Sequence, residues 1–398
     1  MKSKALFWVA LLLTFVGAAG AAADARPPDL LLITIDTLRA DHLSCNGARN
    51  VTTPNLDRLA RAGVNFSRAR SPVPLTLPSH ASILTGNYPP THGIRDNASS
   101  RLLESQLTLS ELLRSKGYET AAFLGSFVLD RRFGLNQGFE IYDDHVGEGP
   151  EDLESLEAER NASEVFSTFD AWLSARESDR PFFAWLHFYD PHAPYTPPEP
   201  FATDYRADPY AGEVAYVDEV IGSVVGRLEE EDLLQRMVIA VVGDHGEGLG
   251  EHGERTHSLL IYNSTLHVPM LLSAPGRIEP GARVDALVRT IDLPSTLLDL
   301  LGNPQRVGEG RSLVPLISGA EGDRKVESPG PSAYSESMYA GLNLGWSSVR
   351  GVETDTHRLI LGPEAELYDV RADPGERHDI AEEQPELVHE LSQLLETV

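Results

Sequence analysis

Three apolar stretches of strand length, each followed at once by acidic or histidine side chains, constrain the fold of this chain more than any other feature. They are "DLLLITID" (residues 29–36), "RPFFAWLHFYDPH" (residues 180–192) and "RMVIAVVGDHGEG" (residues 236–248). A continuous β-rich apolar run is typical of a strand buried on both faces, as in a parallel sheet. Helical patterns occur over Thr53–Ala62, Ser110–Lys116, Ser163–Ala175 and Tyr210 to about Glu230. This alternation predicts an α/β fold, a doubly wound sheet with helices on both faces and a site at the carboxyl ends of its strands.

The chain has 398 residues, which suffice for one large domain and one small domain. A charged stretch rich in Gly, Pro and Ser, Ser318 to Ser332, predicts a linker between residues 27–318 and 333–398. Beyond the linker, residues 344–370 alternate like antiparallel strands, and residues 382–398 have the pattern of an amphipathic helix. We therefore expect a small C-terminal α+β subdomain with an antiparallel sheet and a helix.

The N-terminus has the pattern of an export signal. Two lysines precede an apolar run over residues 5–20, and Ala21-Ala22-Ala23 provides small residues for cleavage. The alternative is an uncleaved anchor, but the run is shorter than the roughly 20 residues that a membrane span needs. We predict a signal peptide over residues 1–23, a periplasmic or secreted protein, and no transmembrane span in the mature chain. The single cysteine, Cys45, cannot form an internal disulfide.

The formal charge of −27 bears on possible partners. Nucleic acids and anionic membrane surfaces repel such a chain, so neither is an expected partner. An anionic substrate would need a local positive site, which a bound metal ion can provide.

Acidic and imidazole groups at strand ends suit a divalent cation that takes oxygen and nitrogen ligands. Asp36 follows the first run, Asp190 and His192 follow the second, and Asp244-His245 follow the third. Each alone is weak evidence, since an Asp after a strand is more often a helix cap or a turn residue. Together with the hydroxyl-bearing segment "TLPSH" (residues 76–80), they favour a metal-assisted site.

From residue 29 to about residue 319 the chain resembles the sulfatase family of the alkaline phosphatase superfamily, and residues 366–387 resemble that family's C-terminal subdomain. The motifs are "DTLRADHLSCNG", "TLPSHASILTGNYPPTHG", "FYDPHAPY", "GDHGEGLGEHGERTH" and "HVPMLLSAPG". The resemblance implies an alkaline-phosphatase-like catalytic domain over residues 27–318. The spacing of the fourth motif is similar to that of phosphoethanolamine transferases and lipoteichoic acid synthases, which use a threonine nucleophile.

The same resemblance implies roles for individual residues. Asp36, Asp244 and His245 would bind the metal together with Thr76, which occupies the nucleophile position. His192 and His257 match positions that hold the charged group of the substrate. Asp190 could join those two histidines at a second, weaker metal site. Arg39 is a further candidate for contact with the substrate anion.

One departure from the family decides which ester we expect. Sulfatases carry Cys or Ser in a C-x-P-S-R pattern and oxidise it to formylglycine, whereas this chain has Thr76-Leu77-Pro78-Ser79-His80. Oxidation of threonine would give a ketone, so we expect no formylglycine and no gem-diol to expel sulfate by elimination. A phosphorylated threonine can be released by in-line attack of water. Where sulfatases have a G-K-W-H stretch, residues 121–130 contain neither the lysine nor the histidine.

Residue chemistry supports Thr76 as nucleophile apart from the family. Its hydroxyl needs a bound metal or a strong base to react, and the candidate ligands could hold the metal. A helix beginning at Pro78 would favour an anion at its N-terminus. The alternative is that Thr76 only caps that helix. His80 could orient Thr76 or accept its proton, and a purely structural role for this histidine is equally open.

The sequence thus predicts an exported, metal-dependent hydrolase that cleaves a phosphate ester, in first place a phosphodiester, through a covalent Thr76 intermediate. The alternatives are a sulfatase without formylglycine, a phosphoethanolamine-type transferase and a catalytically inactive binding protein of the same fold. The expected substrate is a small anionic ester or an envelope lipid or glycan. Zn, Mn, Mg or Ca would suit the ligands. Acidic loops at residues 143–161 and 204–209 could select cationic head groups.

Overall fold

The computed structural model describes residues 26–97, 100–146, 159–318 and 332–397. The predicted signal peptide and most of the predicted linker lie outside these residues, as does most of the predicted acidic loop at residues 143–161. The boundaries proposed for the two domains therefore stay predictions. None of the described helices is both long and apolar enough to cross a membrane.

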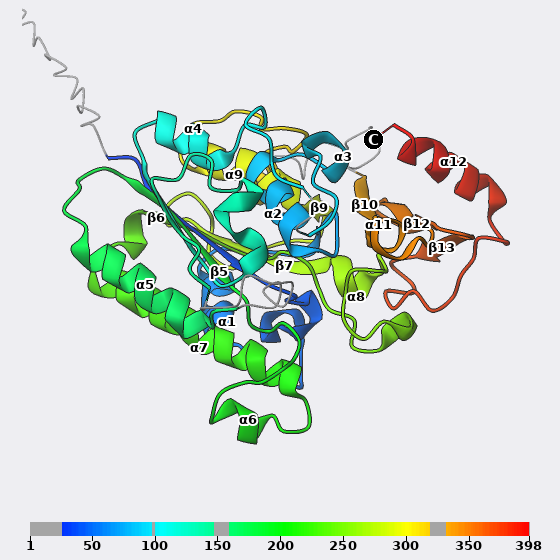
Figure 1. Ribbon diagram of the computed structural model, residues 1–398, viewed down its shortest axis with the longest axis horizontal. Helices are drawn as coiled ribbons and strands as arrows, with labels where there is room; N and C mark the ends of the chain where they lie inside the picture. Colours follow the sequence, from blue (N-terminus) through cyan, green and yellow to red (C-terminus); the bar gives the residue numbers. More distant parts are fainter. Residues whose placement is uncertain (1–25, 98–99, 147–158, 319–331, 398) are drawn as a thin grey trace, which may run out of the picture.

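The large sheet is built around β1, the first of the three apolar stretches (Figure 1). Its main path runs in the order β4-β3-β5-β1-β6-β7-β2-β8, and β9 pairs with β2. The strands are β1 Asp29–Ile35, β2 Val64–Arg70, β3 Glu119–Leu124, β4 Ile141–Asp143, β5 Phe182–Phe188, β6 Met237–Gly243, β7 His267–Ser273, β8 Ala282–Val284 and β9 Val288–Arg289. β1 lies parallel to both β5 and β6 and is completely buried. The three predicted strands are therefore neighbours in one sheet.

One strand runs against the others, which the sequence did not predict. β7 is antiparallel to both β6 and β2, so the sheet is mixed rather than wholly parallel. The chain between β6 and β7 contains only short helices, η7 Glu251–Gly253 and α8 Asn263–Leu266. A parallel strand would need a crossover, usually through a longer helix.

Successive residues of β1 point into two different cores, because side chains alternate across a strand. Leu30 and Leu32 belong to one core, which the helices α2 Thr76–Thr85, α4 Leu109–Ser115 and α9 Leu293–Leu300 also enter. Leu31, Ile33 and Ile35 belong to the other, with α1 Pro54–Ala62, α5 Ala162–Ala175 and α7 Pro209–Glu230. Figure 1 shows these two helix layers on opposite sides of the sheet. The predicted sheet with helices on both faces is confirmed.

The C-terminal part forms a second, smaller sheet at one end of the molecule (Figure 1). Its four antiparallel strands are β10 Ala333–Ser337, β11 Val349–Glu353, β12 His357–Leu361 and β13 Ala365–Asp369, and α12 Pro385–Leu395 packs on them. The predicted antiparallel sheet and helix are therefore present. The remaining short helices are α3 Pro89–His92, α6 Phe201–Asp204, α10 Val314–Ile317, α11 Tyr339–Leu344, η1 Ala40–His42, η2 Ser44–Asn46, η3 Phe127–Leu129, η4 Arg131–Phe133, η6 Leu234–Arg236 and η8 Thr290–Asp292.

Candidate active site

The candidate site forms where β1, β5 and β6 end side by side. The Asp36 N–H donates to the Phe188 carbonyl (2.9 Å), and the Asp244 N–H donates to the Ile35 carbonyl (3.2 Å). These bonds continue the pairing of the sheet one residue past the strands, so the backbone fixes both aspartates. Both side chains are completely buried.

Thr37, directly after Asp36, has a backbone conformation that a β-branched residue rarely adopts. Its φ is 51°, in the left-handed region. Its N–H donates to Asp244 Oδ1 (3.2 Å) and its hydroxyl donates to the Pro191 carbonyl (2.9 Å). Such strain persists only where surrounding contacts impose it, and it occurs often at functional sites.

Thr76 lies at the start of α2, and the helix begins two residues earlier than predicted. Leu75 is the N-cap residue and makes no side-chain cap bond, so Pro78 lies in the first turn of the helix and is not its first residue. Pro78 is tolerated because N–H groups in the first turn have no partner within the helix. Thr76 therefore does not cap the helix. Its hydroxyl lies 3.3 Å from Asp36 Oδ2 and 3.3 Å from His245 Nε2, and only 3% of the residue is exposed.

The protonation of His245 follows from its hydrogen bond. Nδ1 lies 2.9 Å from the Gly246 carbonyl, which can only accept, so Nδ1 carries the proton. Burial lowers the pKa of this imidazole to about 3, which keeps it neutral. Nε2 therefore presents a lone pair 3.4 Å from Asp36 Oδ1 and 3.6 Å from Asp244 Oδ2. Three electron-rich atoms face one another here.

A divalent cation fits this donor set. Asp36, Asp244 and His245 place ligand atoms within 4.8 Å of one another, and among the described residues Asp190, His192 and His257 do not form a second group of this kind. Asp244 Oδ2 is buried without a hydrogen-bond partner in the described part of the chain. Burial and then the charge of Asp36 raise the pKa of Asp244. A bound cation would balance both carboxylates, and two oxygens with one imidazole nitrogen suit Zn, Mn or Mg.

His192 and His257 lie beside the metal-ligand group. The ring of His257 is 4.6 Å from that of His245 and 5.0 Å from that of His192. His257 Nδ1 lies 3.1 Å from Oε1 of the fully buried Glu247. Burial lowers the pKa of His257, but the hydrogen bond and charge of Glu247 outweigh it, so the net shift is upward. The upward shift favours the protonated imidazole, which suits contact with a substrate anion.

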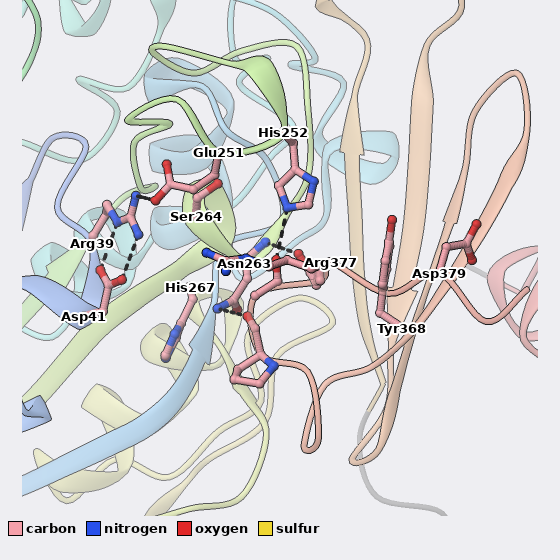
Figure 2. Close-up of a pocket in the computed structure, with 13 residues that line it drawn as sticks. Arg39, Asp41, Glu251, His252, Asn263, Ser264, His267, Tyr368, Arg377 and Asp379 are labelled. Atoms are coloured by element: carbon pink, nitrogen blue, oxygen red, sulfur yellow. Dashed lines mark hydrogen bonds and ion pairs between the residues drawn. The ribbon is translucent and has the colours of Figure 1, made fainter.

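The other two predicted site residues, His80 and Arg39, have different surroundings. His80 Nδ1 is 2.7 Å from the Thr76 carbonyl and Nε2 is 2.9 Å from the Thr34 hydroxyl, so its contacts favour an orienting role. Arg39 forms ion pairs with Asp41 (2.7 Å) and Glu251 (2.8 Å) and lines a cavity of about 730 Å³. Figure 2 shows this cavity between the η7 loop and the C-terminal segment. Contact of Arg39 with the substrate stays a prediction.

Three residues of the site were missed from the sequence: Thr34, His187 and Glu247. Thr34 and His187 are paired residues on β1 and β5, and both are completely buried. The feature of the sequence that could have indicated them is a threonine and a histidine within otherwise apolar runs. Glu247 stands in the quoted motif "GDHGEG", but no role was assigned to it.

Comparisons with known proteins identify the family of this chain. The family model described as "Sulfatase" matches residues 28–303, and the model "N-sulphoglucosamine sulphohydrolase, C-terminal" matches residues 250–398. Arylsulfatase A of Homo sapiens is 27% identical, with 95% of this chain and 88% of the relative covered. The ulvan-active sulfatase of Formosa agariphila is 26% identical, with 89% of this chain and 77% of the relative covered.

Solved structures share the fold at lower identity. A structure in complex with its substrate D-glucosamine-2-N,6-O-disulfate has a TM-score of 0.76 at 22% identity, with 94% of this chain and 97% of that chain covered. The phosphonate monoester hydrolase of Agrobacterium radiobacter has a TM-score of 0.76 at 21% identity, with 93% and 95% covered. The family model covers most of the chain, and the fold of this chain brings the metal-ligand group and Thr76 together. The chain therefore belongs to the sulfatase family, whose members are ester hydrolases of the alkaline phosphatase superfamily.

Proposed function

We propose that this chain is a metal-dependent hydrolase that cleaves a phosphate ester, in first place a phosphodiester, through a covalent intermediate on Thr76 and without formylglycine. The observation that carries the proposal is the position of the Thr76 hydroxyl, 3.3 Å from both Asp36 Oδ2 and His245 Nε2. A side chain at the nucleophile position that cannot become an aldehyde requires a different route from that of formylglycine sulfatases.

In the proposed reaction, Thr76 Oγ1 attacks phosphorus and loses its proton, which passes by way of solvent to the leaving oxygen. The bond from phosphorus to the leaving oxygen breaks as the new Oγ1–P bond forms. Water then attacks phosphorus in line, the Oγ1–P bond breaks, and a proton of the attacking water passes to Oγ1 of Thr76. A divalent ion, when bound, supplies positive charge next to the nucleophile and to the phosphoryl oxygens.

The histidines beside the site would hold the substrate. His257, whose protonated form the Glu247 carboxylate favours, would bind one non-bridging oxygen, and His192 would bind a second. We propose a phosphorylated envelope component as the substrate class, because the predicted signal peptide would place the enzyme outside the cytoplasm.

A second candidate function is hydrolysis of a sulfate ester without formylglycine, and the curated relatives favour it, since those named above are sulfatases. The fold does not choose between the two, because it also occurs in a phosphonate monoester hydrolase. The side-chain chemistry does distinguish them. A sulfated threonine lacks the elimination route of a gem-diol, so water would have to attack sulfur directly.

Paired turnover assays test the proposal. The purified mature protein is stripped of metal, reloaded with Zn, Mn or Mg, and assayed with p-nitrophenyl phosphate, bis(p-nitrophenyl) phosphate and p-nitrophenyl sulfate. We expect metal-dependent cleavage of a phosphoester, with Thr76→Ala lowering kcat by at least about 10³-fold. Thr85→Ala is the matched control, because this buried threonine of the same helix donates to the Ala81 carbonyl (2.7 Å) and accepts from the Asn87 N–H (3.2 Å), neither of which belongs to the site. Its activity should stay near that of the wild type.

The covalent intermediate gives a second readout. Acid quenching during turnover should leave a phosphoryl group on the peptide that contains Thr76, and accurate mass distinguishes it from a sulfuryl group. Faster release of sulfate with a sulfurylated peptide would establish the second candidate instead. Metal binding without turnover of any of the three esters would overturn the hydrolase proposal in favour of a transferase.

A further inference from the structure

One hydroxyl group near the carboxyl end of β1 connects the two imidazoles that lie behind the metal-ligand group. Thr34 is completely buried within the apolar segment "LLLITI". Its Oγ1 lies 2.9 Å from Trp185 Nε1, 3.0 Å from His187 Nδ1 and 2.9 Å from His80 Nε2. A hydroxyl offers one donor and two acceptor positions, so these three contacts use all of them.

The three contacts fix the rings relative to each other. The indole N–H can only donate, which occupies one acceptor position of Thr34. The Thr76 carbonyl accepts from His80 Nδ1 (2.7 Å), so in the neutral ring His80 Nε2 accepts the hydroxyl proton of Thr34, and His187 Nδ1 donates to the hydroxyl. Thr34 thus holds both rings in one mutual orientation.

The opposite nitrogens of both rings face the two carboxylates of the metal-ligand group. His187 Nε2 lies 3.5 Å from Asp36 Oδ2, and His80 Nδ1 lies 3.6 Å from Asp244 Oδ2. Within the described residues, His187 Nε2 and Asp244 Oδ2 are buried atoms without a hydrogen-bond partner. Thr34 is therefore connected through His187 to Asp36 and through His80 to Asp244 by ring-to-carboxylate contacts of 3.5 Å and 3.6 Å, while the hydrogen bond of His80 Nδ1 goes to the Thr76 carbonyl (2.7 Å).

We propose that Thr34 is a positioning residue for the metal site, whose hydroxyl holds the two imidazoles that orient Asp36 and Asp244 toward the cation. Outer contacts of this kind orient metal ligands, and their loss commonly weakens metal binding about 10- to 100-fold. This inference rests on the metal site of the proposed function. Its test measures metal binding and not ester cleavage, so the two proposals can fail separately.

The test compares variants that remove or keep the hydroxyl. Thr34→Val keeps the branched shape and Thr34→Ala removes it, and both lack the hydroxyl, whereas Thr34→Ser retains it. Thr120→Val is the matched control, because Thr120 is a buried strand threonine of β3 whose hydroxyl donates to the Gly138 carbonyl (2.7 Å), outside the site. The Kd for Mn²⁺ and for Zn²⁺ is measured on metal-free protein by competition with a chelating dye.

We expect Thr34→Val and Thr34→Ala to raise the Kd about 10- to 100-fold, with Thr34→Ser and Thr120→Val within about threefold of the wild type. Thermal unfolding in the presence of a chelator shows which variants fold. If Thr34→Val does not fold, the comparison of Thr34→Ala with Thr34→Ser answers the same question. Equal metal affinity in those two variants, or an equal loss in Thr120→Val, would overturn the proposal.

Discussion

At the scale of single residues, the metal-ligand group lowers the stability of the metal-free protein, because its buried carboxylates are arranged to bind a cation. Asp244 is buried beside Asp36, and burial together with the charge of Asp36 raises its pKa. Oδ1 accepts the N–H groups of Thr37 and His245, whereas Oδ2 faces His245 Nε2 at 3.6 Å. Without a cation, the second oxygen adds negative charge where no donor meets it.

We therefore predict that Asp244→Asn stabilises the metal-free protein and abolishes the stabilisation by metal. The asparagine keeps the Oδ1 acceptor, and its amide can donate to His245 Nε2, so in chelator the variant should melt at a higher temperature than the wild type. With metal at roughly 100 times its Kd, the wild type should gain about 2.7 kcal/mol and the variant almost nothing. Differential scanning calorimetry with chelator and with Mn²⁺ measures both.

Asp218→Asn is the control for that prediction, because Asp218 is also a buried aspartate whose pKa burial raises, to about 6, and it accepts the backbone N–H groups of Asn55 and Leu56, away from the site. Its response to metal should equal that of the wild type. An Asp244→Asn protein that gains as much from metal as the wild type would contradict the assignment of Asp244 as a ligand.

The sequence could indicate Asp36, Thr76 and Asp244 because each stands directly after a strand or at a helix start. Thr34 and His187 could not be indicated in the same way. A β-branched threonine suits a strand whatever its hydroxyl does, and a histidine in an apolar run has no partner visible in the sequence. Their role depends on the register that pairs β1 with β5.

At the scale of elements, α7 stabilises the start of α1. The N-cap residue of α1, Thr53, makes no side-chain cap bond. Asp218 of α7 takes its place, accepting from the N–H groups of Leu56 (2.8 Å) and Asn55 (3.1 Å). A side chain from one helix thus satisfies the free donors of another.

We predict that Asp218→Ala lowers the free energy of unfolding by about 1–3 kcal/mol, because it leaves two N–H groups of α1 unpaired. Hydrogen exchange at the amides of residues 55 and 56 should accelerate. Glu219→Ala, at the exposed neighbouring position of the same helix, is the control and should change urea unfolding little. Equal stability of the two variants would exclude this capping role.

Most helices and strands could be predicted from the sequence, but their boundaries and the antiparallel direction of β7 could not. α5 begins at Ala162, one residue before the prediction, because Asn161 and Glu164 form a capping box. α2 begins at Thr76 because Leu75, which has no capping group, ends the preceding extended segment. The antiparallel direction of β7 depends on how the loop after Asp244 returns, which local residue patterns do not specify.

At the scale of the whole molecule, one buried carboxylate joins the two sheets. Glu353 of β11 accepts from Arg70 Nε (2.6 Å) and Arg68 Nη2 (3.2 Å), both on β2 of the large sheet. Arg358 of β12 contacts the same carboxylate and also Glu376 (2.9 Å). Sequence patterns predicted both sheets but not this junction, because its members come from strands distant in the chain.

Glu353→Gln should therefore destabilise the molecule by about 3–5 kcal/mol at neutral pH, because it leaves buried arginines without their carboxylate. Burial raises the pKa of Glu353, but the charges of Arg70 and Arg358 lower it by a larger amount, so the net pKa lies below the ordinary 4.5. A lowered pKa means that the unfolded chain binds this proton first, so the contribution is complete above about pH 4.5 and is lost progressively as the pH falls below it. The difference in melting temperature between wild type and Glu353→Gln should consequently narrow between about pH 5 and about pH 3.

Glu396→Gln, which removes the exposed pair of Glu396 with Arg350 (3.3 Å), serves as the control and should cost at most about 1 kcal/mol. A difference that stays constant down to about pH 3 would show that the Glu353 carboxylate does not hold the two sheets together.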